Sequence, residues 1–474
     1  MTDLAPAAIA KKLQAIAVQM GFTIKRTSRS LYVKDGEDFC ATLVNVHGRV
    51  MATPDSVGST LLTLVDCREL LATIGELGAG DVVIANEASS SGGVATHLAD
   101  LHVIAPYYAG DVLVGYGLAF IHSSDIGGRV PSSISPFNTD VFQEGLQLPP
   151  VKLVRAGVLN DDVDQIIRIN NRTPDANAAD IRAMLAALHV GRAGVAELVE
   201  RYGVDRYLAA QDALEQHSIA RARELVSALP AGRRVFSDFL DDDGISPYPV
   251  RYQVALTVQE DGGLAVDFTG TDVQVPAAFN IVSRGRPQPM TTGRIRSALV
   301  TLDPTFDADG GHTQILSVTA PEGTVVNAVR PAAVGVRHGS AVRVSDTIGG
   351  AFVQLAPQIM PVAGSGVVIP VVVSEQDGHG RGSQVITRLF GGFGAAHGLD
   401  GHDGKDNSYS NLASSPMESS EAELDVHVLR YGLRPDSGGP GRWRGGMGRE
   451  LSFRIDADGT QVLARGLERF VFRP

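Results

Sequence analysis

Residues 92–128 constrain this chain most, because they place imidazoles and carboxylates at the ends of two apolar runs. The stretch reads GGVATHLADLHVIAPYYAGDVLVGYGLAFIHSSDIGG. His97 and Asp100 stand at the start of the first run, and His122 and Asp125 stand at the end of the second. Both runs have the length and composition of neighbouring strands. A hairpin between them would bring His97, Asp100 and His122 together, which is the make-up of a metal site.

Imidazole and carboxylate groups together form a donor set for a transition metal. Zn, Fe, Mn and Co accept this mixture, whereas a Ca or Mg site normally lacks histidine. With three or four protein ligands, such a site keeps a position open for water or for a substrate carbonyl. The alternative is a group of ordinary polar loop residues, because an HxxD pair is short and common. The spacing by itself leaves both interpretations open.

Composition and charge exclude several classes of protein. The chain has 474 residues, of which 44% are hydrophobic and 20% charged, enough for a sizeable core in roughly two to four domains. A net charge of −12 without a long basic run argues against binding of nucleic acid. Cys40 and Cys67 lack CxxC spacing and fit core thiols in a reducing compartment. With no signal-peptide pattern and no membrane-spanning run, we expect a cytoplasmic protein that does not interact with membranes.

Hydrophobic periodicity predicts a mixed α+β chain in which the N-terminal region, residues 1–160, contains the candidate metal site. An amphipathic helix opens this region and is predicted to end near Gly21. Alternating strands follow, and a second helix is expected over residues 59–77 before the strand DVVIANE. The N-terminal region is therefore expected to be an α/β unit built around the metal site.

Two further regions complete the expected organisation. Residues 161–230 show helical periodicity throughout and predict a helical arm. Residues 231–474 return to β-branched alternation, with helical patterns near 290–302 and 334–355, and predict a β-rich α+β region. No repeat of fixed period and no low-complexity linker separates these regions. We therefore expect the C-terminal region to pack on the N-terminal region in one continuous body.

Three segments resemble motifs of other proteins but lack an essential part. PDSGGP, at residues 435–440, has proline where a chymotrypsin-like nucleophile motif has its leading glycine, and no AAHC-like histidine lies upstream. GGFG, at 391–394, follows a strand, but AAHGLDGHDGKDN after it cannot open the helix that a phosphate loop needs. The aspartates of that segment are spaced by three, whereas an EF-hand needs a spacing of two. A protease, a nucleotide loop and an EF-hand are therefore rejected.

Nine stretches spread over nearly the whole chain match the motifs of one known family. They are RTSRSLYVKDGEDFCATL, GDVVIANE, GGVATHLADLHVIAP, HSSDIGG, EGLQLPPVKL, NNRTP, DFTGT, GGFGAAHGLDGHDG and LRPDSGGPGRWRGGMGRE. With them the chain resembles the hydantoinase B subunits, which are similar to the C-terminal part of 5-oxoprolinase and to the larger catalytic subunit of acetone carboxylase. The last stretch is the most specific of the nine.

This resemblance implies a hetero-oligomer with a hydantoinase-A-like subunit that binds ATP and Mg. The partner would phosphorylate a carbonyl oxygen of a small-molecule substrate, either a cyclic amide or, together with bicarbonate, an enolised ketone. The metal-binding subunit would finish the reaction with one divalent transition metal, Zn, Fe or Mn. The favoured activity is an ATP-dependent cyclic-amide hydrolase. A ketone carboxylase and a non-catalytic scaffold stay open as alternatives.

The resemblance also implies roles for individual residues of the site. The metal ligands of the family fall on His97, Asp100 and His122, with Asp38 in GEDFCATL as the fourth. Asp125 is the candidate for a catalytic base or for a group that orients a ligand histidine. The other interpretation of Asp125 is an Asx-type cap on the turn DIGG.

The chain departs from the family pattern at three places. Most relatives have a second histidine where this chain has Ser123, and an Asp-Pro pair where it has Glu87 and Ala88. The sequence ends at ERFVFRP, about where relatives continue into a glycine-rich tail. We therefore expect an unusual substrate specificity, and a tail that is absent or lies on another polypeptide.

Overall fold

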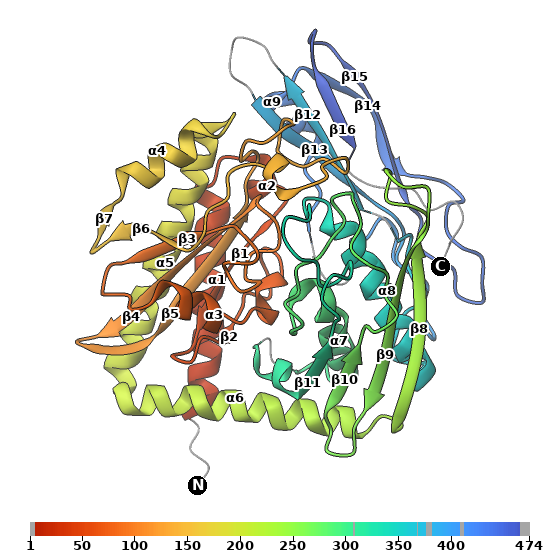
Figure 1. Ribbon diagram of the computed structural model, residues 1–474. Coiled ribbons are helices and arrows are strands. Elements are labelled where there is room, and N and C mark those ends of the chain that lie inside the picture. The colour runs from red at the N-terminus through yellow and green to blue at the C-terminus, as the bar shows by residue number, and fades with distance from the viewer. Residues whose placement is uncertain (1–4, 307–308, 367, 376–381, 408–411, 465–474) are drawn as a thin grey trace.

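The computed structural model describes residues 5–306, 309–366, 368–375, 382–407 and 412–464. About 33% of the chain is helical and 24% is in strands, so the mixed α+β class is confirmed. Figure 1 shows two α/β halves side by side, with the C-terminal strands above and beside the second half. No helix among these residues combines the length and the apolar character that a membrane crossing requires. The ERFVFRP end of the chain lies outside the described residues.

A seven-stranded antiparallel sheet forms the first half. Its order is β2-β1-β5-β4-β3-β6-β7. The strands are β1 (Phe39–Val44), β2 (Val50–Ala52), β3 (Val82–Ala85), β4 (Asp100–Ala109), β5 (Val112–His122), β6 (Val151–Arg155) and β7 (Val158–Leu159). Strands β4 and β5 form the predicted hairpin, and their register pairs Asp100 directly with His122. The two runs recognised in the sequence are therefore adjacent strands with their polar ends together.

Helices cover both faces of this sheet. They are α1 (Ala5–Thr27), α2 (Leu31–Lys34), η1 (Leu61–Leu64), α3 (Arg68–Ile74), η2 (Val141–Gln143), α4 (Asp161–Ile169), α5 (Pro174–Tyr202) and α6 (Val204–Ser227). Helices α1 and α5 lie side by side and share one hydrophobic core with the sheet. The other face packs against η1 and α3, and Cys40 and Cys67 are buried free thiols in that core. The sheet is thus enclosed between two layers.

Two helix boundaries differ from the sequence prediction. Helix α1 does not end at Gly21 but continues to Thr27. A Cβ at Gly21 would lie 2.6 Å from Cγ1 of Val57, so the glycine permits close packing there. The helix expected over 59–77 divides into η1 and α3, because the segment between them is tied to the β1–β2 turn. In this segment, the Cys67 amide donates a hydrogen bond of 2.9 Å to the Gly48 carbonyl.

The helical segment after the sheet packs into the body of the molecule. Buried residues of α5, among them Ile181, Met184 and Leu188, belong to the core shared with α1 and the sheet. Helix α6 crosses the bottom of Figure 1 and contacts both α1 and η3 (Gly311–Ile315) of the second half. The segment is therefore a bridge between the halves and does not project as an arm. The boundaries at 160 and 230 stay predictions.

The second half is built on a four-stranded sheet of order β11-β10-β9-β8. Its strands are β8 (Gly232–Leu240), β9 (Val250–Val258), β10 (Leu264–Asp267) and β11 (Leu316–Thr319). Only β10 and β11 run parallel. Helices α7 (Pro289–Leu302) and α8 (Arg337–Leu355) pack in its core, so the helices predicted near 290–302 and 334–355 are confirmed.

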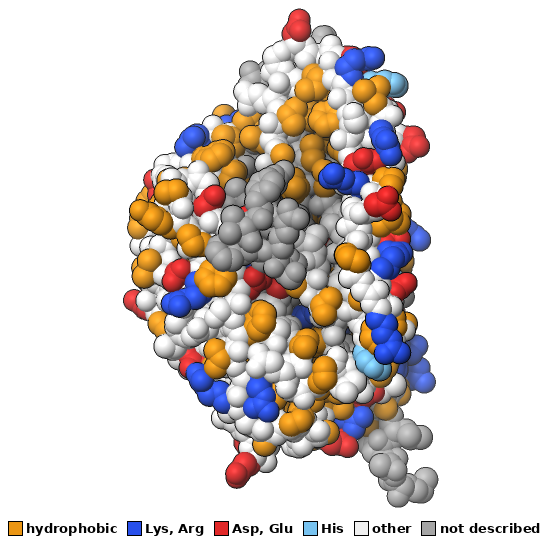
Figure 2. All heavy atoms as spheres, turned by 90° about the vertical axis from the view of Figure 1, so that its right-hand side faces the viewer, with side chains coloured by type: hydrophobic (Ala, Val, Ile, Leu, Met, Phe, Trp, Pro, Cys, Tyr) orange, Lys and Arg blue, Asp and Glu red, His pale blue; other side chains and the backbone are white. Residues whose placement is uncertain are grey.

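The C-terminal strands form two small sheets. The elements are β12 (Val368–Glu375), β13 (Gly382–Phe390), α9 (Met417–Glu423), β14 (Val426–Leu433), β15 (Arg449–Ile455) and β16 (Gln461–Ala464). One sheet has the order β13-β12-β16, and the other pairs β14 with β15. Strand β13 contacts α2 of the first half, so this part of the chain reaches back toward the start. Figure 2 shows the outer face of this region and of β8, where Lys and Arg side chains follow one edge among acidic ones.

Candidate metal centre

A cavity of about 70 Å³ lies where the β4–β5 hairpin, the start of α8 and strand β13 meet. Its polar and charged lining residues are Tyr32, Asp38, His97, Asp100, His122, Arg337, His338 and Arg388. A single water needs roughly 10–15 Å³ of such space, so a small group of a few atoms fits beside these side chains. The lining therefore combines the candidate ligands of the first half with basic residues of the second half and of the C-terminal strands.

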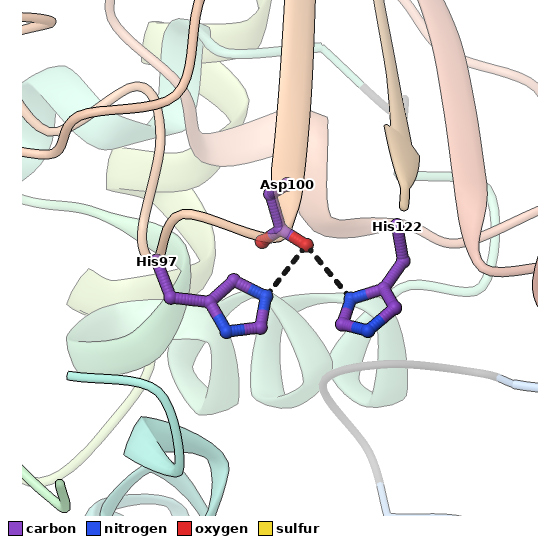
Figure 3. Close-up of side chains that lie close together, drawn as sticks. All are labelled: His97, Asp100 and His122. Carbon is purple, nitrogen blue, oxygen red and sulfur yellow. Dashed lines mark hydrogen bonds and ion pairs between the residues drawn. The ribbon is translucent and has the colours of Figure 1, made fainter. Parts of the chain in front are cut away.

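His97, Asp100 and His122 form a compact group of donor atoms at the end of the hairpin (Figure 3). Oδ1 of Asp100 lies 2.8 Å from Nε2 of His97 and 3.2 Å from Nδ1 of His122. One potential ligand atom from each residue falls within 4.8 Å of the other two. All three residues are buried. The structure thus brings together the three side chains that the hairpin predicted.

The protonation of His97 tests whether a metal fits this group. Its Nδ1 lies 3.0 Å from the carbonyl oxygen of Gly335, which can only accept, so Nδ1 carries the hydrogen. Burial, followed by the nearby Arg337 charge, lowers the pKa of His97 to about 3, so the ring is neutral at pH 7. Nε2 then presents a lone pair to the carboxylate of Asp100. Two acceptors in contact repel each other unless a cation lies beside them.

The distances within the group agree with shared coordination. Two ligand atoms that each lie roughly 2.0–2.2 Å from one ion are separated by about 2.8–3.6 Å at tetrahedral or octahedral angles. The 2.8 Å and 3.2 Å separations from Oδ1 of Asp100 are consistent with this range. The donor set of two imidazoles and one carboxylate suits Zn, Fe or Mn. The residues present therefore fit a divalent transition metal.

Arg337 and Thr96 hold the other oxygen of Asp100. Nη2 of Arg337 donates to Oδ2 at 2.7 Å, and the Thr96 hydroxyl donates to the same oxygen at 3.1 Å. Burial raises the pKa of Asp100, but the Arg337 charge and the hydrogen bonds to the carboxylate outweigh it and hold this pKa well below its usual value. Asp100 is therefore ionised, with Oδ2 fixed and Oδ1 directed at the histidines.

Asp38 lines the same cavity but stands apart from the three donor residues. It directly precedes β1, and its carbonyl accepts a 2.9 Å hydrogen bond from the His122 amide. Nη2 of Arg388 donates to its Oδ2 at 2.9 Å. Among the described residues, the donor group within 4.8 Å contains His97, Asp100 and His122 without Asp38. The structure thus places the expected fourth ligand beside the group, with its carboxylate engaged by an arginine.

Asp125 is buried in the loop after β5 and is not among the residues that line the cavity. Its Oδ1 accepts hydrogen bonds from the amides of Gly127 at 2.9 Å and Arg172 at 3.0 Å. Its Oδ2 accepts from the Ser132 amide at 2.8 Å and from Nη1 of Arg172 at 3.1 Å. The bond to Gly127 is that of an Asx turn. Of the two roles that the sequence left open, these contacts support the turn former.

Sequence reasoning missed the basic residues of the cavity. Arg337 and His338 open α8, and Arg388 lies in β13, among the buried residues 385–388. The arginine inside the strand-like run SQVITRLF could have indicated a functional or paired charge, because a buried charge requires a partner. The partner itself was out of reach, since Arg388 and Asp38 are 350 residues apart.

Glu144 supports His97 from behind. Its Oε1 accepts hydrogen bonds from the amides of Val334 at 2.9 Å and Gly335 at 2.6 Å, and the Gly335 carbonyl holds His97. Burial raises the pKa of Glu144 to about 8, which the two amide bonds only partly offset. The folded protein therefore favours a protonated Glu144 near neutral pH.

This raised pKa predicts a pH dependence of stability that Glu144→Gln removes. The stabilisation that the buried, protonated Glu144 carboxyl contributes is fully present below its unfolded pKa near 4.5. This stabilisation is lost as pH rises through the folded pKa of about 8. Between pH 5 and 8 the wild type should therefore lose up to about 4 kcal/mol of unfolding free energy relative to Glu144→Gln. Urea unfolding of both proteins at pH 5, 6.5 and 8 measures the difference. A difference that does not change with pH would contradict the prediction.

Comparison with known proteins places the chain among hydantoinase-type subunits. It is 31% identical over 477 residues to a protein provisionally named as the B subunit of a D-/L-hydantoinase from Pseudomonas sp. (strain NS671), covering 96% of this chain and 80% of that relative. The ATP-dependent caprolactamase from Pseudomonas jessenii has a similar structure, with a TM-score of 0.81 and 24% identity over 95% of this chain and 78% of that one.

A second solved structure shares the fold. Nucleotide-free acetone carboxylase has a TM-score of 0.84 and 17% identity, covering 98% of this chain and 64% of that chain. The sequence itself matches the Hydantoinase B/oxoprolinase family over residues 5–474. With nearly its whole length matched, this chain belongs to the Hydantoinase B/oxoprolinase family.

Proposed function

We propose that this chain is the metal-binding catalytic subunit of an ATP-dependent cyclic-amide hydrolase. The observation that carries the proposal is the convergence of His97, Asp100 and His122, whose potential ligand atoms lie within 4.8 Å of one another, with Oδ1 of Asp100 2.8 Å from His97 and 3.2 Å from His122. The relative named as part of a hydantoinase, like the family as a whole, supports a cyclic amide as the substrate.

In this proposal, His97, Asp100 and His122 hold one divalent transition metal. When bound, such a metal polarises a carbonyl and lowers the pKa of a water molecule. Arg337 and Thr96 keep Asp100 ionised and oriented. Asp38 is the other carboxylate among the described residues that line the cavity, so we assign it as the fourth ligand or as the base.

ATP is consumed in a partner protein, which we take to be hydantoinase-A-like. The name of the hydantoinase relative designates one subunit of an enzyme with more than one, which supports a hetero-oligomer. The partner would activate the small-molecule substrate by phosphorylating its carbonyl oxygen, and this chain would receive the activated group. A ketone carboxylase that also consumes bicarbonate is the alternative within the same family resemblance.

The experiment that tests the function reconstitutes this chain with its hydantoinase-A-like partner. We expect Mg-ATP to be cleaved and a ring to be opened with a hydantoin, 5-oxoproline or caprolactam, both measured in one reaction. His122→Ala should lose ring opening because a ligand is gone. Ring opening by the variant at the wild-type rate would contradict the proposal, and ATP use that requires a ketone and bicarbonate would favour the carboxylase.

The isolated chain is expected not to bind ATP. Among the described residues, the glycine-rich segment 391–394 is followed by coil and not by a helix, so it has no amide cluster for phosphates. Calorimetric titration with Mg-ATP should therefore give no binding heat up to millimolar nucleotide. Micromolar binding would contradict the assignment of ATP to the partner.

A further inference from the structure

The charges that line the cavity balance each other before a metal is added. Asp100 pairs with Arg337 at 2.7 Å, and Asp38 pairs with Arg388 at 2.9 Å. The other polar lining residues described are Tyr32 and three histidines, so these two pairs are the Arg–carboxylate ion pairs of the lining. A divalent cation then leaves two positive charges without compensation. Uncompensated charge in a buried site is costly, so the metal-loaded cavity favours an occupant with about two negative charges.

Arg388 has unused capacity to bind such an occupant. Its side chain is 2% exposed and makes one described hydrogen bond, through Nη2 to Asp38, while Nη1 is buried without a partner. A buried donor without a partner is destabilising, so this guanidinium gains from an added acceptor. An arginine fork matches the oxygens of a phosphate or carboxylate group.

The surroundings keep this guanidinium in place. Cζ of Arg388 lies 5.4 Å from the centre of the Tyr32 ring, and the same ring lies 4.7 Å from that of His122. A Cβ on Gly36 would come within 2.2 Å of Nη1, so the glycine leaves the room that the arginine needs. Arg388 is therefore held next to the candidate metal group by packing as well as by Asp38.

We propose that Arg388 forms an oxyanion subsite beside the metal position and binds the phosphoryl group of the activated substrate. This inference rests on the proposed function, because a phosphorylated carbonyl supplies the two negative charges that the metal-loaded cavity lacks. Bicarbonate has the same oxyanion chemistry with less charge, and it would occupy the subsite in a carboxylase. Cyclic-amide hydrolysis and ketone carboxylation would then both place an oxyanion in this subsite, although only the first acts on a ring.

The first test uses the wild-type chain and three small probes. Metal content is measured first, and a chain that takes up no metal would overturn the proposed function itself. Calorimetry then compares inorganic phosphate, bicarbonate and neutral acetamide on the metal-loaded and metal-free chain. We expect phosphate to bind the loaded chain at least about tenfold more tightly than the metal-free chain, and acetamide to bind neither. Equal phosphate affinity with and without metal would overturn the subsite, and tighter binding of bicarbonate than of phosphate would assign it to carboxylation.

The second test locates phosphate at Arg388. With Mn²⁺ in the chain, phosphorus NMR of inorganic phosphate should show strong paramagnetic broadening. Arg388→Gln should retain the metal and lose at least about tenfold in phosphate affinity, and Arg388→Lys, which keeps the charge without the fork, should lie between it and the wild type. Arg444→Gln is the matched control, because Arg444 also pairs with an aspartate, Asp403 at 2.7 Å, but lies in an exposed loop.

Two results of this test would overturn the proposal. One is wild-type phosphate affinity in Arg388→Gln with the metal retained. The other is loss of the metal from Arg388→Gln, which would mean that Arg388 serves only to align Asp38. Should neither Arg388 variant fold, the comparison of loaded and metal-free wild type decides the question.

Discussion

Purified wild-type chain is expected to contain about one transition metal per molecule, and His97→Ala or Asp100→Ala to remove it. Each variant deletes one of three or four ligands, so metal affinity should fall by at least about 100-fold, beyond the loss seen when only a supporting group is changed. Ring opening in the reconstituted complex should fall with the metal. Elemental analysis after gel filtration measures the occupancy.

Controls separate ligand loss from general damage to the core. Asp100→Ala leaves Arg337 buried without its carboxylate, which can cost about 3–5 kcal/mol, so Asp100→Asn is made in parallel. His312 provides the matched control, because it is fully buried and its Nδ1 donates to the Asp309 carbonyl at 2.8 Å, outside the cavity lining. His312→Ala should retain the metal. Full occupancy in folded His97→Ala and Asp100→Asn would contradict the metal centre.

Asp125→Ala is expected to be among the most destabilising single changes in the chain. Three backbone amides and the Arg172 guanidinium would lose their acceptor in a buried loop. Each unsatisfied buried donor costs about 1–3 kcal/mol, so the free energy of unfolding should fall by at least about 3 kcal/mol. Urea unfolding at fixed pH measures the loss, with exposed Asp175→Ala as the control that should change little.

The milder Asp125→Asn decides between the two roles of this residue. A turn former should tolerate the amide with a loss of about 1–2 kcal/mol in stability and open the ring at the wild-type rate per folded molecule. A general base should instead lose about a hundredfold or more in ring opening while ATP cleavage and the metal persist. The second outcome would contradict the structural role that the contacts of Asp125 support.

Local pattern was sufficient for most secondary structure. The spacing of hydrophobic residues along the sequence predicts the buried faces of α1, α5 and α6 and the alternation of the strands. This spacing depends only on residues that are near one another in sequence. The exceptions are places where a distant segment intervenes. Helix α1 continues past Gly21, which serves to make room for Val57, and residues 59–77 do not form one helix because the β1–β2 turn binds the segment between η1 and α3.

The convergence of the three candidate ligands was predictable because one hairpin builds it. Strands β4 and β5 are joined by a short turn, so their register follows from local pairing and places Asp100 opposite His122, with His97 three residues before the strand. Sequence alone therefore determined which imidazoles and which carboxylate could share a cation.

The surroundings of that group depended on packing between distant parts of the chain. Arg337 reaches Asp100 across 237 residues, Arg388 reaches Asp38 across 350, and the Gly335 carbonyl that fixes the tautomer of His97 comes from 238 residues away. Asp125 likewise accepts hydrogen bonds from Arg172, 47 residues away, besides those from amides of its own loop. Hydrogen bonds and charge pairs of this kind leave no periodic trace in a sequence, because their geometry exists only after the two halves and the C-terminal strands have come together.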